Sequence, residues 1–484
     1  MTLGRAIATV GGFTLLSRIV GFVRDMVLSA LLGSGAAADA FFVAFKLPNF
    51  FRRLFAEGAF SAAFVPLFAR ELQGHGRDQA LTFARQAHAA LLIVLLPFTV
   101  LLILAMPGVM ALLAPGMRGD PSTFAMAVEF GRIAFPYLLF ISLTSLYGGV
   151  LNSIDRFAHV AATPILLNIA LIAAVLGLTP FLPNSGYAAA VGVTVAGFLQ
   201  WLWLLVACAR HGVGITLVRP RWTERVARLV KLATPVAIGG GVQQISAILD
   251  VVWASLLPVG TISALYYADR LAQLPLGVVG VAIGTALLPL LARQLRAGQD
   301  DSAMANQNRA VEFGLLLSLP AALALWLLAE PLIRVLFERG RFGPDDTWRA
   351  GGALAAFALG LPAFVLVKAL TPGFFAREDT RTPLYIAVAA IAANIALNAT
   401  FLFGTTLAQV GIALASSLSG WLNATLLAAV LLRRGQWLPD ARLKQRAIRM
   451  AGATAGMGAV VWAASAALAP LLAHANFLGV IAVA

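Results

Sequence analysis

Charged side chains lie within segments of this sequence that are otherwise strongly apolar. The stretch SRIVGFVRD, residues 17–25, carries Arg18, Arg24 and Asp25 among isoleucine, valine and phenylalanine. A charged side chain costs about 2.5–3.5 kcal/mol at the centre of a membrane-spanning helix, so each one calls for a partner or a function. The cations within predicted apolar helices are Arg18, Arg24, Lys46, Arg52, Arg53, Arg132, Arg270 and Lys368.

Residues 36–69 carry a polar stripe along one face of a predicted helix. Polar residues seven apart return to nearly the same face of a helix with 3.6 residues per turn. Arg53 and Glu57 also have the i, i+4 spacing of a salt-bridged pair. We expect this face to line a water-filled interior, because phenylalanines occupy much of the other faces. The stripe comprises Asp39, Lys46, Asn49, Arg53 and Glu57, and Arg52 flanks it.

The predicted helices 5–32 and 261–292 carry the other charges of this set. Arg18 and Asp25 share a face, and Gly21 allows a bend that turns Arg24 inward as well. In the second helix Asp269 precedes Arg270. Neutralisation of each cation by a neighbouring carboxylate is the alternative, but it leaves a surplus of cations. A surplus that is mainly arginine suits a planar oxyanion held in a bidentate manner, which indicates a phosphate-bearing substrate.

A second polar set consists of oxygen-bearing side chains. Asp250 lies in the middle of the predicted helix 225–257, and Asn394 and Asn398 share a face of the predicted helix 382–404. Carboxylate and amide oxygens suit Na⁺ or proton binding, so Na⁺ or H⁺ is the coupling ion that we expect. The alternative is that the asparagines only hydrogen-bond neighbouring helices.

The composition indicates a polytopic α-helical membrane protein. Apolar residues make up 60% of the chain and charged residues 12%, against about 25% charged in soluble domains. Thirteen long helices are predicted, and the chain ends in NFLGVIAVA, an incomplete fourteenth. Most loop lysines and arginines fall on the side that carries the N-terminus, which the positive-inside rule assigns to the cytoplasm. The excess of basic residues therefore requires no nucleic acid.

Internal repeats divide the chain into two halves. VPLFAREL at 65–72 matches LPLLARQL at 288–295, and TPILLN at 163–168 matches TPLYIA at 382–387. The predicted organisation is a six-helix lobe over residues 1–220, a second over 221–435, and helix 13 with part of helix 14 over 436–484. Six helices per lobe give both lobes the same orientation, with a pseudo-twofold axis along the membrane normal. Parallel repeats around a central site are typical of transporters.

Several functional classes are disfavoured by the residues that the chain has. The single cysteine, Cys208, allows no internal disulfide, and the five histidines show no metal-ligand spacing. Because no nucleophile is paired with a base, an enzyme acting on lipid phosphates is a distant alternative. We therefore predict no catalytic residue, no metal and no organic cofactor. Exporters of cationic drugs need an acidic cavity, whereas this one is predicted to be basic.

The sequence resembles the MurJ (MviN) family of lipid II flippases. The resemblance is carried by SRIVGFVRD, DAFFVAFKLPNFFRRLFAEGAFSAAFVPLF, YYADRLAQLPLGVVGVAIGTALLP and KALTPGFFAREDTRTP, and it extends from about residue 4 to beyond 430. That family belongs to the superfamily of multidrug, oligosaccharidyl-lipid and polysaccharide exporters. The resemblance implies a fourteen-helix, multi-pass protein of the bacterial inner membrane, in which helices 13 and 14 form a groove for the lipid tail.

The resemblance also implies a substrate and the residues that meet it. The substrate would be lipid II, undecaprenyl-diphosphate-linked disaccharide-pentapeptide, carried to the periplasmic leaflet by a monomer that contacts membrane lipids. The substrate-binding arginines would be Arg18, Arg24, Arg52 and Arg270, with supporting or gating roles for Asp25, Asp39, Lys46, Asn49, Arg53, Glu57 and Asp269. A flippase for another polyprenyl-linked oligosaccharide is the main alternative.

Overall fold

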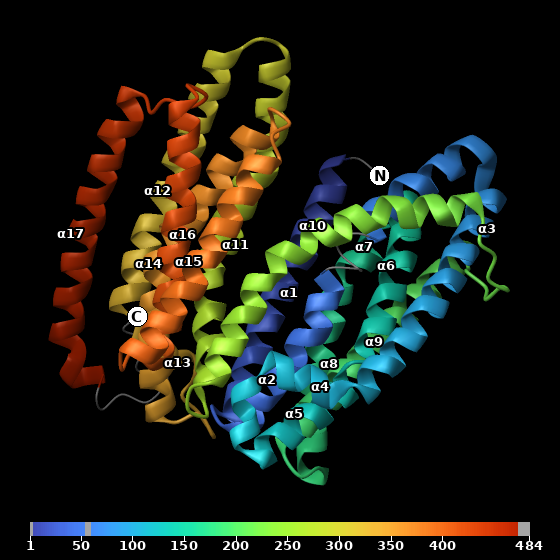
Figure 1. The fold of residues 1–484 in the computed structure, drawn as a ribbon, viewed down its shortest axis with the longest axis horizontal. Helices are drawn as coiled ribbons and strands as arrows, with labels where there is room; N and C mark the ends of the chain where they lie inside the picture. Colours follow the sequence, from blue (N-terminus) through green and yellow to red (C-terminus); the bar gives the residue numbers. More distant parts are fainter. Residues whose placement is uncertain (1–2, 54–59, 473–484) are drawn as a thin grey trace. The chain divides into compact units, whose positions relative to one another are not determined.

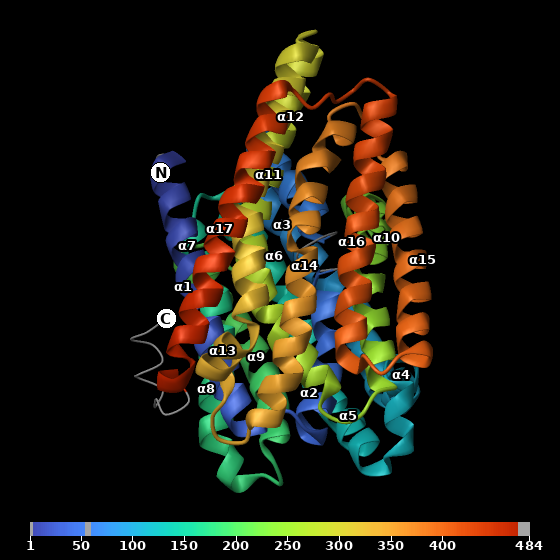
Figure 2. The same cartoon turned by 90° about the vertical axis from the view of Figure 1, so that its left-hand side faces the viewer.

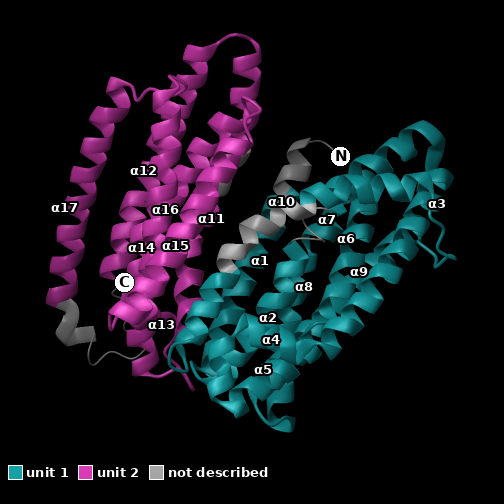
Figure 3. Ribbon diagram, viewed as in Figure 1, with its two compact units in different colours: residues 1–262 teal, residues 263–484 magenta. Residues whose placement is uncertain are grey.

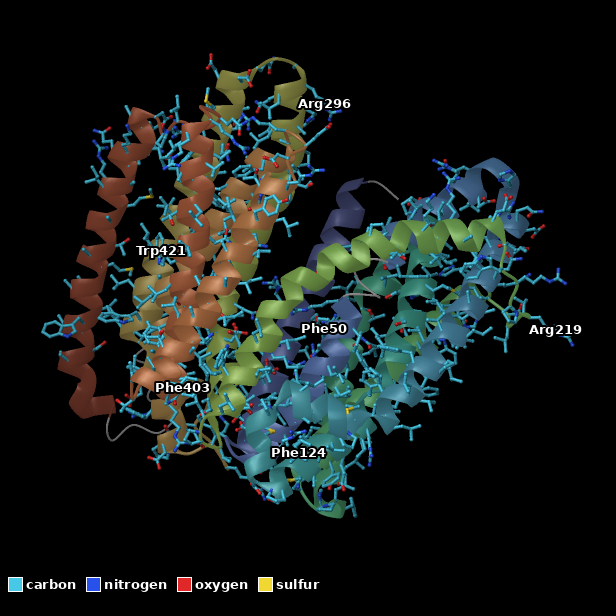
Figure 4. All side chains as sticks on the ribbon, viewed as in Figure 1. Phe50, Phe124, Arg219, Arg296, Phe403 and Trp421 are labelled. Carbon is cyan, nitrogen blue, oxygen red and sulfur yellow. The ribbon has the colours of Figure 1, made fainter. Side chains whose placement is uncertain are left out.

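The structure, a computed structural model, describes residues 3–53 and 60–472, which form helices joined by loops and turns (Figures 1 and 2). This confirms the predicted all-α fold class. Nine helices in this described part have the length and apolar composition of a membrane span. Large apolar side chains on these helices are exposed, among them Phe403 (78% exposed) and Trp421 (37%), which Figure 4 labels. Such exposure is expected where helices face lipid tails.

The chain divides into two compact units, residues 1–262 and 263–484 (Figure 3). The helices of the first unit are α1 (Leu3–Leu32), α2 (Ala36–Phe51), α3 (Ser61–Leu104), α4 (Met106–Leu113), η2 (Pro115–Gly119), α5 (Pro121–Ala134), α6 (Tyr137–Ser153), α7 (Phe157–Ala161), α8 (Thr163–Leu178), η3 (Thr179–Phe181), α9 (Ser185–Arg210) and α10 (Glu224–Ser255). Next come α11 (Thr261–Arg296), where the division falls, and then α12 (Asp300–Leu327), α13 (Ala329–Phe337), α14 (Pro344–Phe375), α15 (Arg381–Gly404), α16 (Ala408–Arg433) and α17 (Ala441–Leu472).

Each unit has its own apolar core. In the first unit α3, α6 and α9 pack around stacked phenylalanine rings, including Phe64, Phe68 and Phe83. In the second unit the core joins α11, α12, α14 and α16 around Leu291, Val365 and Leu427.

The compact units divide at residue 262 rather than at residue 220, where the sequence repeat divides the chain. The difference is α10, which opens the second repeat but packs against α3, α4 and η2 of the first unit. Gly116 donates its backbone N–H to Ser255 Oγ at 3.2 Å, which ties the end of α10 to η2. The two lobes that the repeats indicate, with their boundary at residue 220, stay a prediction. The contacts within the structure assign α10 to the first compact unit.

The helix boundaries differ from the sequence-based ones in a few places. The helix predicted over 36–69 is represented by α2, which ends at Phe51, and by the start of α3. Within α3 the backbone leaves the helical region at Gly76, where φ is 81°, a value that glycine adopts without steric cost. The loop predicted between residues 69 and 86 is therefore a tight reversal between two helical arms. The incomplete fourteenth helix lies in residues 473–484, outside the described residues.

A cluster of ion pairs attaches α17 to α12. Glu312 of α12 has a side chain that is only 10% exposed, and it pairs with Arg309 and with Arg446 of α17. Arg442 adds a contact at 3.5 Å, and Arg309 also pairs with Asp440 in the preceding loop. These pairs anchor the first turns of the helix that the sequence predicts as helix 13.

Candidate functional site

Arg24 is a buried cation on α1, with only 5% of its surface exposed. Its Nε and Nη2 donate to Asp25 Oδ1 at 3.0 and 2.6 Å, and its Nη1 donates to Asn168 Oδ1 at 2.8 Å. Asp25 is 1% exposed, so the carboxylate that balances the guanidinium is buried with it. A buried charge is tolerable when it is both paired and hydrogen-bonded, and Arg24 meets both conditions.

Asn168 comes from α8, which packs beside α1. Besides accepting from Arg24, its Nδ2 donates to the backbone carbonyl of Ser17 at 3.1 Å. The two helices approach closely here, because a Cβ on Gly21 would lie 3.2 Å from Asn168 Nδ2. Our sequence analysis missed Asn168. The available signal was a single amide in the otherwise apolar run ILLNIALIAAVLGL.

The polar stripe on α2 contains both buried and accessible positions. Asp39 is 3% exposed, and its Oδ2 accepts from the backbone N–H of Gly260 at 2.7 Å. Our expectation of a water-facing Asp39 therefore differs from its observed place, where it holds the turn before α11. Towards the C-terminal end of α2, Lys46 is half-buried. Just beyond that end, Arg52 Nε donates to Asn49 Oδ1 at 3.3 Å.

The other predicted residues of this set are distributed as follows. Arg18 on α1 and Arg53 beyond the end of α2 are exposed. Glu57, and with it the predicted Arg53–Glu57 pair, lies outside the described residues. In the second unit, Arg270 on α11 is half-buried and its Cζ lies 5.9 Å from the ring centre of Tyr266, within the range of a cation–π contact. Asp269 accepts from Gln273 one turn later.

The oxygen-bearing set is divided between the two units. Asp250 lies on α10 of the first unit, where it is half-buried. Asn394 and Asn398 lie on α15 of the second unit, each 1% exposed, and Asn398 Nδ2 donates to Asn394 Oδ1 at 3.0 Å. The two asparagines thus share a face, as their spacing requires. A cation site that also includes Asp250 stays a prediction.

An apolar groove lies between α12, α14 and α17 of the second unit. It encloses about 440 Å³ and is lined by Leu323, Trp326, Pro362 and Thr454, among others. Among the described residues, no group of three or more histidine, cysteine or acidic side chains could hold a metal ion.

Electrostatic effects outside the membrane-spanning helices stabilise the loops of the second unit. Hydrogen bonds from Thr382, together with Arg434 at 2.7 Å, lower the pKa of Asp379 to about 2. The backbone N–H of Leu443 and the guanidinium of Arg309 lower the pKa of Asp440 in the same direction. Both carboxylates are therefore ionised over the physiological pH range and keep their helix-connecting turns in place.

Comparison with known proteins places these features in a family. The family model described as "Lipid II flippase MurJ" matches residues 28–481. A probable lipid II flippase MurJ of Rhizobium meliloti (strain 1021) is 48% identical, over 96% of this chain and 87% of the relative. The lipid II flippase MurJ of Burkholderia cenocepacia is 36% identical, over 94% and 88%.

Solved structures agree on the fold. A lipid II flippase MurJ in an inward closed conformation matches with a TM-score of 0.80 at 24% identity, over 98% of this chain and 95% of that one. An inward-facing MATE-family multidrug transporter matches with a TM-score of 0.73 at 14% identity, over 88% and 96%. The extent of the family model and the identity of the relatives together show that this chain belongs to the MurJ family of multi-pass membrane transporters.

Proposed function

We propose that this protein is a lipid II flippase that carries the undecaprenyl-diphosphate-linked peptidoglycan precursor from the cytoplasmic to the periplasmic leaflet. Family membership supports the substrate, because relatives at up to 48% identity carry that name. The observation that carries the chemistry is Arg24, a buried guanidinium on an apolar helix, held by hydrogen bonds to Asp25 and Asn168. A guanidinium positioned in this way supports a role in binding the anionic diphosphate.

The proposed mechanism is alternating access with the diphosphate held by arginines. An arginine presents donors in a fixed fork that matches phosphate oxygens, whereas a lysine presents a point charge. In the described arrangement Asp25 neutralises Arg24. An arriving diphosphate would compete with Asp25 for Arg24 and would gain further contacts from Arg18, Arg52 and Arg270. Departure of the substrate would return Arg24 to Asp25, so that no bare charge stays buried.

The setting of the proposed cycle is the bacterial inner membrane. The distribution of loop cations supports a cytoplasmic N-terminus. The apolar groove between α12, α14 and α17 supports a place for an undecaprenyl chain beside the second unit. We propose that a single chain carries out the cycle, with Na⁺ or H⁺ as the coupling ion.

The test is depletion of this protein in its own host. We expect accessible lipid II to disappear from the periplasmic leaflet within the time that existing protein is diluted, while total lipid II rises. Re-expression of the wild-type chain should restore it. Unchanged lipid II exposure with loss of a different polyprenyl-linked glycan would favour the alternative substrate, and covalent turnover of the lipid would favour an enzyme.

A further inference from the structure

Three parts of α1 converge on one side chain of α8. Asn168 accepts from Arg24, donates to the carbonyl of Ser17, and lies against Gly21, where no Cβ intervenes. Asn168 is 5% exposed, so water does not compete freely for these bonds. Its two amide groups are therefore both used, one on the cation and one on the backbone that carries the cation.

We infer that Asn168 is a positioning residue for Arg24, and that as a neutral amide it orients the guanidinium without adding a second negative charge that would repel a diphosphate. This inference rests on the proposed function. Asp25 holds the Nε and Nη2 edge of the guanidinium, and Asn168 holds Nη1. Partners at both edges of the guanidinium fix the orientation of its plane.

Charge explains why an amide suits this position. Arg24 is already paired with one carboxylate, that of Asp25. A second carboxylate in place of Asn168 would add negative charge beside the guanidinium and would repel the diphosphate. A neutral acceptor orients Nη1 without adding to that repulsion.

The hydrogen bond from Asn168 to the backbone of α1 makes the orientation of Arg24 depend on how α8 packs against α1. Asn168 Nδ2 donates to Ser17, about two turns before Arg24 on the same helix. Because Gly21 lies between them, the amide fits against the helix surface, where a Cβ on residue 21 would lie 3.2 Å from Nδ2 and would push the amide away. A shift of α8 along α1 would therefore move the amide away from Nη1, so the orientation of Arg24 depends on the α1–α8 contact.

The test compares isosteric variants in binding. Purified protein in nanodiscs is titrated with undecaprenyl diphosphate, a lipid that carries the diphosphate without the sugar. We expect Asn168→Asp to weaken binding by about tenfold or more, since the added carboxylate repels the diphosphate and placing like charges side by side costs at least a factor of ten in affinity. Asn168→Asp combined with Asp25→Asn moves the single carboxylate to the other side of the guanidinium and should recover most of that loss.

A matched control separates positioning from packing. Gln200 is a buried amide on α9 that donates to the carbonyl of Thr163 at 2.8 Å, at the start of the same helix α8. Gln200→Met should lower the melting temperature and leave diphosphate affinity within about twofold of wild type, because a distant packing defect does not touch the arginine. Gly21→Ala, which displaces the Asn168 amide without changing charge, should weaken binding less than Asn168→Asp does.

The outcomes distinguish this inference from the function on which it rests. If the wild-type protein binds no diphosphate lipid, the proposed function fails. If the wild type binds and the folded Asn168→Asp protein binds equally well, the inference is wrong. If Asn168→Asp does not fold, Gly21→Ala decides, and wild-type affinity in the folded Gly21→Ala protein would overturn the inference.

Discussion

Helices α8 and α15 correspond to each other in the sequence repeat, yet their buried asparagines lie at different positions along the helix. The repeats TPILLN and TPLYIA align them 219 residues apart, which pairs Asn168 with Ala387. The same offset pairs Asn394 of α15 with Val175 of α8, and Asn398 with Thr179, the first residue of η3. One unit thus has its amide near the start of the helix and the other has two amides further along.

The partners of these amides differ as much as their positions. Asn168 bonds a guanidinium and a backbone carbonyl of the neighbouring helix, whereas Asn394 and Asn398 bond each other. The first arrangement supports the proposed anion site at Arg24. A cation site at Asn394 and Asn398 stays a prediction. The duplicated scaffold therefore keeps its helices and changes where polar groups are placed.

The turns that precede these helices show the same separation of backbone from chemistry. Asp155 and Glu378 both adopt φ of 61°, at the ends of α6 and α14. The next residue is Arg156 in the first unit and Asp379 in the second. The first unit then inserts α7, and the second proceeds directly to α15. The two turns share a residue with positive φ, but the next residue is basic in the first unit and acidic in the second.

The largest effect should come from removing the cation of the first unit. Arg24→Ala removes the guanidinium from a buried ion pair with Asp25, and breaking a buried pair from one side costs about 3–5 kcal/mol. We expect loss of lipid II flipping together with a lower melting temperature. Arg24→Lys should restore much of the stability but little of the transport, because a point charge does not reproduce the fork. Full transport by the lysine variant would show that charge alone suffices.

An intermediate effect should come from the amides of the second unit. Asn394→Leu leaves Asn398 buried without its hydrogen-bond partner, which costs about 1–3 kcal/mol. If these oxygens bind a cation, wild-type protein should melt at higher temperature as Na⁺ replaces choline at constant ionic strength, and Asn394→Leu or Asp250→Asn should abolish the shift. Asn168→Leu in the first unit is the matched comparison and should retain the Na⁺ response. Melting that is independent of Na⁺ and pH in the wild type would leave the asparagines a purely structural role.

The smallest effect should come from the turn before α15. The pKa of Asp379 is held at about 2, below the ordinary value of 3.8. A carboxylate with a lowered folded pKa contributes stability above its unfolded pKa and loses it as the pH falls towards the folded one. Asp379→Asn should therefore flatten the dependence of melting temperature on pH between about 4 and 2. Arg156→Gln, at the equivalent turn of the first unit, should leave that dependence unchanged, and an equal response of both would contradict the assignment to Asp379.

Much of the fold could be predicted because membrane helices obey local rules. Apolar runs of sufficient length, ended by Gly, Pro or charge, indicated helices such as α9 and α16 within a residue or two, since each helix satisfies its own backbone hydrogen bonds in lipid. The cost of burying charge singled out Arg24 and Asp25 for the same reason. These properties depend on residues that are neighbours in sequence.

Tertiary structure decided what the sequence alone left open. Asn168 lies 144 residues from Arg24, and only the packing of α8 on α1 brings them together. Asp39 belongs to a polar stripe by its spacing, but its bond to Gly260 comes from the turn after α10, more than 200 residues along the chain. The repeat divides the sequence before α10, and the packing of α10 on α3 assigns it to the first unit. Helical periodicity determines which face of a helix is polar, whereas the partner of that face is chosen by close packing between distant segments.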